Sequence, residues 1–420
     1  RESRGAEAPL SLFREVGRAR RSALCVLSAR AALLGMGCVG ARQKPALPEV
    51  RPRRGRFHAE NVVAKKLGKG AYASVYAVSK AVGEEPKYAA KVVCLHGEAS
   101  STPEMVSREL QILQKVSDTR SKFVVQFVES FVEGHFVYMV MEKCDQSLLG
   151  ALTSLPNITE ATYRPMFRQM AKALEIIHSA GVVHRDVKPD NFMCVAGGDG
   201  RRLVKLCDFG LATVVSDASR EELKGINGTA PFLAPEMVKG SRYGAKVDTW
   251  SLGVIFYLLL FGHFPYMPLE WTTSEMKRAI REGLPAPPFA PRVKWFAGDE
   301  DMEDALSLTA EDFVVHLLIR LPRDRPTAAE ALRHEFFAGP SQSTGRSLRP
   351  MLESARHCGA FDLPREKEEV PSEVDVALAA LQVRHGHDSP WSRQTTASSE
   401  CSSEPLTPET PPAKSKHQAA

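Results

Sequence analysis

The pattern of hydrophobic and polar positions divides the middle of the chain into a first part of strands and a second part of helices. In the first part, short β-prone runs are separated by turns, and one stretch, residues 102–116, has the apolar spacing of a helix. The predicted strands cover residues 61–67, 74–78, 88–93, 124–131 and 135–141.

After residue 157 the apolar positions take the period of long helices. Thr309 with Asp312, and Thr327 with Glu330, have the spacing of capping boxes and predict where two helices begin. We therefore expect an α+β architecture, in which a small strand-rich lobe precedes a larger helical lobe. The predicted long helices cover residues 159–180, 246–261 and 309–319.

The two ends of the chain differ in composition from this middle region. Residues 1–56 hold 13 Lys or Arg and 4 acidic residues, a net charge of +9, and because the 420 residues carry +5 in total, the rest carries −4. A basic extension outside the folded region does not indicate a nucleic-acid partner. We expect a disordered extension over 1–56, a folded domain over 57–338 and a mostly disordered polar tail over 339–420.

The eight cysteines are scattered, without the spacing of a zinc site. Such single cysteines are typical of a reducing compartment, which favours the cytoplasm. The longest apolar stretch, residues 22–40, is interrupted by Arg30, so no transmembrane helix is predicted.

A glycine-rich turn and a lysine on the following strand are candidates for phosphate binding. Gly68 and Gly70 would let the main chain approach phosphate oxygens. Lys91 would contact the phosphates if Glu109, on the first long helix, held its side chain in place. Taken alone, the turn is more often an ordinary hairpin and either charge an ordinary surface charge.

The string from residue 184 to 191 is far more specific than the glycine-rich turn. It brings Asp186, Lys188 and Asn191 into one loop, and Asp208 begins an Asp-Phe-Gly sequence seventeen residues later. Phosphoryl transfer needs a carboxylate to orient the hydroxyl, a cation for the moving phosphate, and oxygen ligands for a metal. The loop and the tripeptide together therefore indicate that reaction.

In this order and spacing the motifs resemble those of the eukaryotic protein kinases, serine/threonine type, nearest in texture to the calcium/calmodulin-related group. The resemblance implies a bilobal fold, with an N-lobe over 57–142 and a C-lobe over 146–338, that transfers the γ-phosphate of ATP, with Mg²⁺, to Ser or Thr hydroxyls of proteins. The alternative is a pseudokinase scaffold of the same fold, although Lys91, Asp186 and Asp208 are all present.

The same resemblance implies a role for each site residue. Asp186 resembles the catalytic base, Lys188 a phosphate contact, Lys91 the ATP lysine and Glu109 its partner. Asn191 and Asp208 resemble the metal ligands, and Thr229, Glu236, Asp248 and Arg325 the substrate-docking and structural residues, with Glu236 paired to Arg325. The implied ATP pocket consists of Leu67, Gly68, Gly70, Val75, Ala89, Lys91, Met141, Glu142, Cys144, Asp145 and Met193.

Regulation and substrate preference leave alternatives open. Arg185 needs an anionic partner. In one interpretation Glu221 or Glu222 supplies it, without phosphorylation of the activation segment between Asp208 and Glu236. In the other, both glutamates are solvated charges. Asp190, beside Asn191, slightly favours substrates with basic residues near the acceptor. We expect a monomer.

The N-terminal region allows two further interpretations. If Met36 is the start, Gly37 and Cys38 are candidates for myristoyl and palmitoyl groups, which together anchor a protein to a membrane. If the first 35 residues are translated, an Arg/Ala-rich organelle targeting peptide is the alternative.

Overall fold

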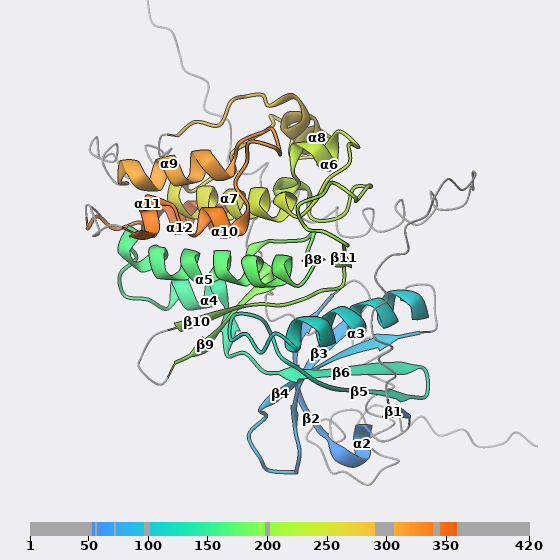
Figure 1. Cartoon of the computed structure of the whole chain (residues 1–420). Coiled ribbons are helices and arrows are strands. Elements are labelled where there is room, and N and C mark those ends of the chain that lie inside the picture. Colours follow the sequence, from blue (N-terminus) through green and yellow to red (C-terminus); the bar gives the residue numbers. More distant parts are fainter. Residues whose placement is uncertain are drawn as a thin grey trace, which may run out of the picture.

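The computed structural model describes residues 53–54, 57–70, 73–95, 101–197, 202–289, 306–338 and 345–358. The chain folds into two lobes (Figure 1), and the crossing from one to the other lies between β6 (Phe136–Glu142) and β7 (Gln146–Ser147). The predicted strand-rich lobe followed by a helical lobe is confirmed.

The first lobe contains a sheet of six strands in the order β1-β5-β6-β4-β3-β2. Neighbours are antiparallel, except that β1 runs parallel to β5. The predicted strand over 124–131 begins later, because Val124 and Val125 pair instead with Leu206 of the second lobe. The strands are β1 (Arg53–Arg54), β2 (Val62–Lys69), β3 (Ala73–Ser79), β4 (Tyr88–Cys94), β5 (Phe127–Glu133) and β6.

Each face of this sheet is covered by a different segment. On one face lies α3 (Pro103–Ser117), which begins where the Thr102 hydroxyl accepts a hydrogen bond from the Met105 amide. On the other face Phe57, in the short helix α2 (Phe57–Glu60), is fully buried and stacks on Tyr138 at 4.0 Å between ring centroids. Burial of such a side chain contributes about 1.5–3 kcal/mol.

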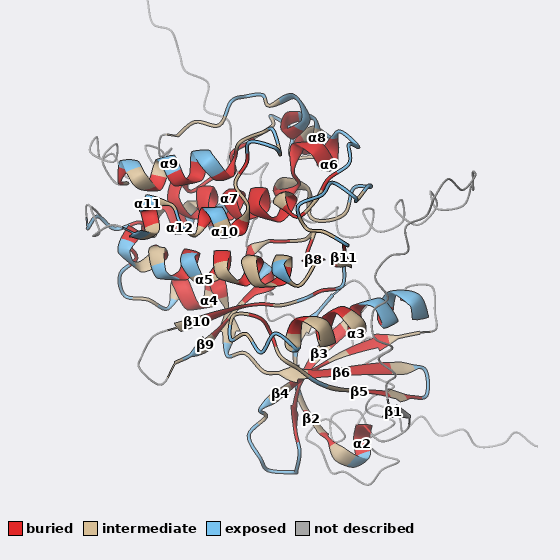
Figure 2. Ribbon diagram, viewed as in Figure 1, coloured by how far each residue is buried: buried red, intermediate tan, exposed pale blue. Residues whose placement is uncertain are grey.

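The second lobe is built around α7 (Lys246–Phe261), which is buried along almost its whole length (Figure 2). It packs against α5, α9 and α12. Gly253 permits this, because a Cβ there would lie 2.7 Å from the Leu317 Cβ. The surrounding helices are α4 (Leu148–Thr153), α5 (Glu160–Ser179), α6 (Pro235–Val238), α8 (Thr273–Glu282), α9 (Leu308–Leu317), α10 (Ala328–Ala331), α11 (Glu335–Ala338) and α12 (Arg349–His357).

Short strands between the lobes hold the two loops that carry the polar residues of the predicted site. One loop runs from β8 to β9 and includes the turn η1 (Pro189–Asn191), and the other runs from β10 to β11. Pairing of β9 with β10 and of β8 with β11 brings both loops together. The strands are β8 (Val182–Val183), β9 (Phe192–Ala196), β10 (Arg202–Leu206) and β11 (Thr213–Val214), and a second turn, η2, covers Ala230–Phe232.

One of the two predicted capping boxes is confirmed. Thr327 and Glu330 exchange side-chain-to-main-chain hydrogen bonds at the start of α10. The prediction at Thr309 is wrong, because Ser307 caps α9 by accepting from the Ala310 amide, so the cap lies two residues before the predicted one.

Part of the polar C-terminal tail, which we expected to be mostly disordered, is a helix docked on the second lobe. Met351, Leu352 and Ala355 of α12 are buried, and Leu348 donates its amide to the Ile158 carbonyl at 2.6 Å. The folded unit thus extends to residue 358, beyond the expected boundary at 338. Within the described ranges, no helix has both the length and the apolar character needed to cross a bilayer.

Candidate active site

The ammonium group of Lys91 on β4 lies between two carboxylates from distant parts of the chain. Its Nζ donates to Glu109 Oε1 on α3 at 2.6 Å and to Asp208 Oδ1, after β10, at 2.8 Å. Burial alone would lower the pKa of Lys91, but the two negative charges raise it overall. The charge of Lys91 in turn lowers the pKa of Asp208 to about 2. Lys91 and Asp208 are therefore both charged at neutral pH.

Strand register places Lys91 on the same face of the sheet as three apolar side chains of the predicted pocket. Val75 lies opposite Lys91, and Ala89 lies opposite Met141. Opposite residues, and residues two apart on one strand, share a face of a sheet. Four predicted site residues, Val75, Ala89, Lys91 and Met141, thus share the face that α3 covers. Met193 lies on β9, which pairs with β7 just after the crossing between lobes.

The glycine-rich turn has the openness that phosphate contact requires. Gly68 lies opposite Val75, and a Cβ at Gly68 would meet no atom within 4 Å. The Gly70 amide donates to the Ala73 carbonyl at 2.7 Å. Leu67 before them is 39% exposed, which is unusual for leucine and leaves its side chain available to cover a ligand.

Side-chain hydrogen bonds hold the segment that connects the lobes. Glu142 Oε1 accepts from Lys205 Nζ at 2.7 Å and from the Gln126 amide at 2.8 Å. Asp145, our candidate for a ribose contact, accepts from the Ala196 amide at 2.7 Å. Burial raises the pKa of the Cys144 thiol to about 12, so it is not a reactive thiolate. The ribose assignment of Asp145 stays a prediction.

Asp186 lies in a triangle of polar groups at the other end of the site. Its Oδ2 contacts Lys188 Nζ at 2.8 Å, and its Oδ1 accepts from the Thr229 hydroxyl at 2.8 Å and amide at 2.9 Å. Lys188 also donates to the Thr229 hydroxyl at 3.1 Å. Gly228 makes this approach possible, because a Cβ there would lie 2.4 Å from the Arg185 carbonyl oxygen. The loop before α6 is thus fastened to the catalytic loop.

Main-chain and side-chain hydrogen bonds position Asn191 and Asp208, the two predicted metal ligands. The Asn191 side-chain nitrogen donates to the Asp186 carbonyl at 2.8 Å, which fixes the amide and leaves its oxygen as an acceptor. The Cys207 amide donates to the Asn191 carbonyl at 2.9 Å, which brings Asp208 beside it. A carboxylate and an amide oxygen are both donor types that suit Mg²⁺.

Buried Asp248 organises the backbone of the catalytic loop. Its two carboxylate oxygens accept from the main-chain amides of His184 and Arg185, each at 2.8 Å, and Oδ2 also accepts from His178 Nε2 at 2.8 Å. Burial alone would raise the pKa of Asp248, but these bonds lower it. Arg185 and Asp208 have positive φ angles of 68° and 59°. Such strained positions are kept only where surrounding contacts enforce them.

The predicted pair of Glu236 and Arg325 is present and fully buried in the second lobe. Arg325 donates to both oxygens of Glu236, at 2.6 and 3.0 Å. Its guanidinium also lies 4.9 Å from the centroid of the Trp250 ring. Glu236 lies on α6, and Arg325 contacts α7 at Trp250 and at the Lys246 carbonyl. The pair therefore joins α6, and the loop of Thr229 that precedes it, to α7.

The predicted pairing of Arg185 with Glu221 or Glu222 is wrong. Arg185 Nε donates to the Leu211 carbonyl at 2.7 Å, and no carboxylate among the described residues contacts its guanidinium. Glu222 instead accepts from the hydroxyl and amide of Ser216, six residues earlier. A local hydrogen bond thus forms in place of the distant ion pair.

Two further residues position the site and were not singled out in the sequence. His178, at the end of α5, contacts Asp248 seventy positions away. Lys205 holds the segment between the lobes through Glu142, sixty-three positions away. Neither lies in a recognisable motif. Lys205 could have been noticed as a charge within an otherwise apolar strand.

Comparison with known proteins agrees with this geometry. The family model described as protein kinase domain matches residues 62–337. A calcium/calmodulin-dependent protein kinase of Metarhizium anisopliae is 32% identical over 330 residues, which cover 75% of this chain and 80% of that protein. The MAP kinase-interacting serine/threonine-protein kinase mnk-1 of Caenorhabditis elegans is 30% identical over 339 residues, which cover 73% of this chain and 45% of that protein. A Dictyostelium discoideum kinase named for myosin light chain is 30% identical over 275 residues, 65% of each chain.

The chain belongs to the protein kinase family. Its relatives assign it to the serine/threonine class, of the calcium/calmodulin-dependent type. The chain spans less than two thirds of the length of two of the three relatives. The predicted family and fold class are confirmed, and the individual roles of the site residues remain predictions that the geometry supports.

Proposed function

We propose that the chain transfers the γ-phosphate of ATP to serine and threonine hydroxyls of protein substrates. The observation that carries this proposal is the position of Lys91 between Glu109 and Asp208, at 2.6 and 2.8 Å. A pseudokinase scaffold does not need this arrangement. The membership in a family of protein kinases, which generally use ATP with Mg²⁺, supports the same conclusion.

Asn191 and Asp208 would hold the magnesium ion. When bound, the ion neutralises the charge of the nucleotide phosphates and polarises the bond that breaks. Lys91, oriented by Glu109, would contact the phosphates. Val75, Ala89 and Met141 supply an apolar face on which an adenine ring can pack.

Asp186 would orient the acceptor hydroxyl and take its proton, since its carboxylate lies at the centre of the loop. Lys188, 2.8 Å from Asp186, would stabilise the negative charge on the phosphoryl group in transfer. Burial alone would lower the pKa of Lys188, but Asp186 raises it, so the side chain stays cationic.

The test is the variant Asp186→Asn in an assay with radiolabelled ATP, Mg²⁺ and a peptide array. We expect turnover to fall about 10²- to 10⁴-fold, the range for removal of a positioned base. The matched control is Asp118→Asn, at the far end of α3. Near-normal turnover of Asp186→Asn, or no transfer by the wild-type chain to any protein, would end the proposal.

Substrate preference and location are also proposals. Exposed Asp190, beside the catalytic loop, supports a preference for basic residues near the acceptor, which the same array would measure. We propose a cytoplasmic monomer, with membrane attachment through acylated Gly37 and Cys38 if Met36 is the start. These three residues lie outside the described ranges. Mass spectrometry of the mature N-terminus decides between acylation and an organelle targeting peptide.

A further inference from the structure

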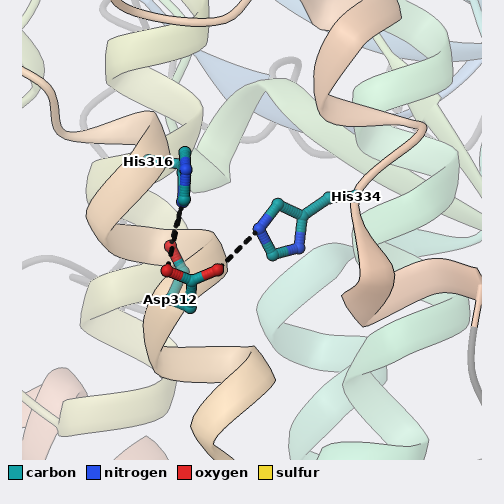
Figure 3. Close-up of side chains that lie close together, drawn as sticks. All are labelled: Asp312, His316 and His334. Carbon is teal, nitrogen blue, oxygen red and sulfur yellow. Dashed lines mark hydrogen bonds and ion pairs between the residues drawn. The ribbon is translucent and has the colours of Figure 1, made fainter.

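A cluster of two histidines and an aspartate lies in the second lobe, among residues that the predicted phosphate-transfer site does not use. Figure 3 shows the three side chains, with both histidines beside the aspartate. Asp312 and His316 are one turn apart on α9, and His334 lies in the turn before α11. One ligand atom of each residue lies within 4.8 Å of the other two. Asp312 Oδ1 is 3.3 Å from His316 Nδ1, and Oδ2 is 3.1 Å from His334 Nε2.

The distance from each histidine nitrogen to its nearer Asp312 oxygen is close to that between neighbouring ligands of a tetrahedral metal ion, and the three ligand atoms within 4.8 Å need only a small contraction to surround one. Ligand bonds of about 2.0–2.1 Å place neighbouring ligand atoms about 3.3 Å apart. Two imidazoles with one carboxylate form a donor set of zinc and of the neighbouring transition metals, whereas Mg²⁺ prefers oxygen ligands alone. Asp312 and His316 are half exposed, so water can complete the coordination.

The cluster is positioned by packing rather than by its own polar contacts. Phe313 on α9 lies against the His334 ring, at 5.0 Å between centroids, and stacks on Phe336 of α11 at 5.1 Å. The Phe336 amide donates to His334 Nδ1 at 3.2 Å. These contacts keep His334 opposite α9, so little ordering is needed when an ion binds.

We propose that Asp312, His316 and His334 bind one divalent transition-metal ion of the zinc class. The ion takes the place of two protons, each of which now lies in a hydrogen bond between a histidine nitrogen and an oxygen of Asp312. His334 Nε2 now donates its proton to Asp312, and His316 Nδ1 donates to the Asp312 carbonyl at 2.9 Å. On binding, the proton of His316 moves to its water-facing Nε2. That of His334 moves to Nδ1, with loss of the hydrogen bond from Phe336.

Because two hydrogen bonds are lost and the described residues supply only three ligands, the site binds reversibly and more weakly than a closed structural zinc site. The bound ion joins α9 to the start of α11. Phe336 and Phe337 of α11 lie beneath the guanidinium groups of Arg164 and Arg168 on α5, at 5.1 and 5.7 Å. The ion therefore stabilises the contact of α9 and α11 with α5.

The experiment is a Co²⁺ titration of the full chain at pH 7.5, by calorimetry and visible absorption, with excess Mg²⁺ and a non-chelating reductant. The variants are His316→Ala and Asp312→Asn, both at exposed positions. The matched control is His357→Ala, because His357 on α12 has the same Nδ1 bond to a carbonyl four residues earlier but only one carboxylate neighbour on its helix, Glu353. Zn²⁺ is then tested for its effect on thermal unfolding.

We expect the wild type and His357→Ala to bind one Co²⁺ ion that both cluster variants lose. At 100-fold excess over the dissociation constant, the midpoint of thermal unfolding rises on the order of 5 °C with Zn²⁺, and His316→Ala abolishes the rise. The eight cysteines also bind these ions, but their bands contain thiolate charge transfer and persist in the variants. Equal stoichiometry and affinity in wild type and both cluster variants, or binding at thiols only, would overturn the proposal.

Discussion

Each lobe contains an ion pair between a basic side chain and a glutamate, but the two pairs differ in solvent exposure and in the number of charged partners. Lys91 and Glu109 are 17% and 9% exposed, and a third charge, the half-exposed Asp208, joins them. Arg325 and Glu236 are 0% and 6% exposed. All five N–H donors of Arg325 are used, two on Glu236 and three on main-chain carbonyls.

This difference separates a working pair from a structural pair. Lys91 shares its charge between two carboxylates, one of which faces solvent and is available to a metal, so the arrangement can exchange partners during a reaction. Arg325 has no donor left to exchange. The first pair should therefore matter for turnover and the second for folding, and variants at each can test that division.

The largest expected effect is on stability, in Arg325→Met. The variant leaves the carboxylate of Glu236 buried without its partner, which costs about 3–5 kcal/mol. Denaturant unfolding followed by circular dichroism measures the change. The control Arg323→Met, whose side chain is 81% exposed, should change the free energy of unfolding by less than about 0.5 kcal/mol. Equal stability of the two variants would contradict a structural role for the pair.

The second effect is on turnover, in Lys91→Met. Loss of an oriented cation at the phosphates should lower kcat/KM about 10²- to 10³-fold. The cost in unfolding free energy should stay below that of Arg325→Met, because Asp208 can return to water. The exposed Lys87→Met, just before the same strand, is the control and should keep full turnover. A large loss of stability with intact turnover per folded molecule would reverse our assignment.

Most of the active site was predictable because its residues lie in short local motifs. Asp186, Lys188 and Asn191 fall within six positions, and Asp208 begins a recognisable tripeptide. Their contacts in the structure follow from the pairing of two short strands. The distant pair of Glu236 and Arg325 was predicted only through the family resemblance, since nothing local marks two residues 89 positions apart as partners.

What the sequence did not reveal depended on competition between nearby partners or on tertiary packing. Ser307 outcompetes Thr309 as a helix cap, although both are suitable. Ser216 takes the carboxylate of Glu222 that we expected at Arg185. His178 and the docked helix α12 have no local signal, because only the folded lobe brings them to their partners.

A third prediction uses pH to test the link between Lys91 and Asp208. Lys91 lowers the pKa of Asp208 from 3.8 to about 2 in the folded protein. When a carboxyl has a lower pKa in the folded state, its ionised form stabilises the protein at every pH above the pKa of the unfolded state. This contribution to the unfolding free energy is lost as the pH falls toward 2. The difference in unfolding free energy between wild type and Asp208→Asn should therefore narrow between about pH 4 and pH 2. Salt should shrink it further, since Asp208 is half exposed. A difference independent of pH would exclude the coupling.

The smallest effect concerns the activation segment. The question is whether the pair of Lys91 and Glu109 forms without phosphorylation of a serine in this segment. Leu223 and Tyr243 exchange two main-chain hydrogen bonds of 3.0 Å, and Gly244 lets the chain at Arg220 pass closely, because a Cβ there would lie 2.5 Å from the Arg220 carbonyl oxygen. These contacts hold the segment without any added charge.

We therefore expect the double variant Ser216→Ala, Ser219→Ala to retain turnover within about twofold of the wild type, since the bonds lost are fully exposed ones of small net value. Phosphatase treatment of the wild type should likewise leave turnover unchanged. Activity that disappears after phosphatase treatment and returns on autophosphorylation at Ser216 or Ser219 would mean that Arg185, whose side chain donates to the Leu211 carbonyl, receives its anionic partner by modification. The arrangement of Lys91 and Glu109 would then be one of two states rather than the resting geometry of the site.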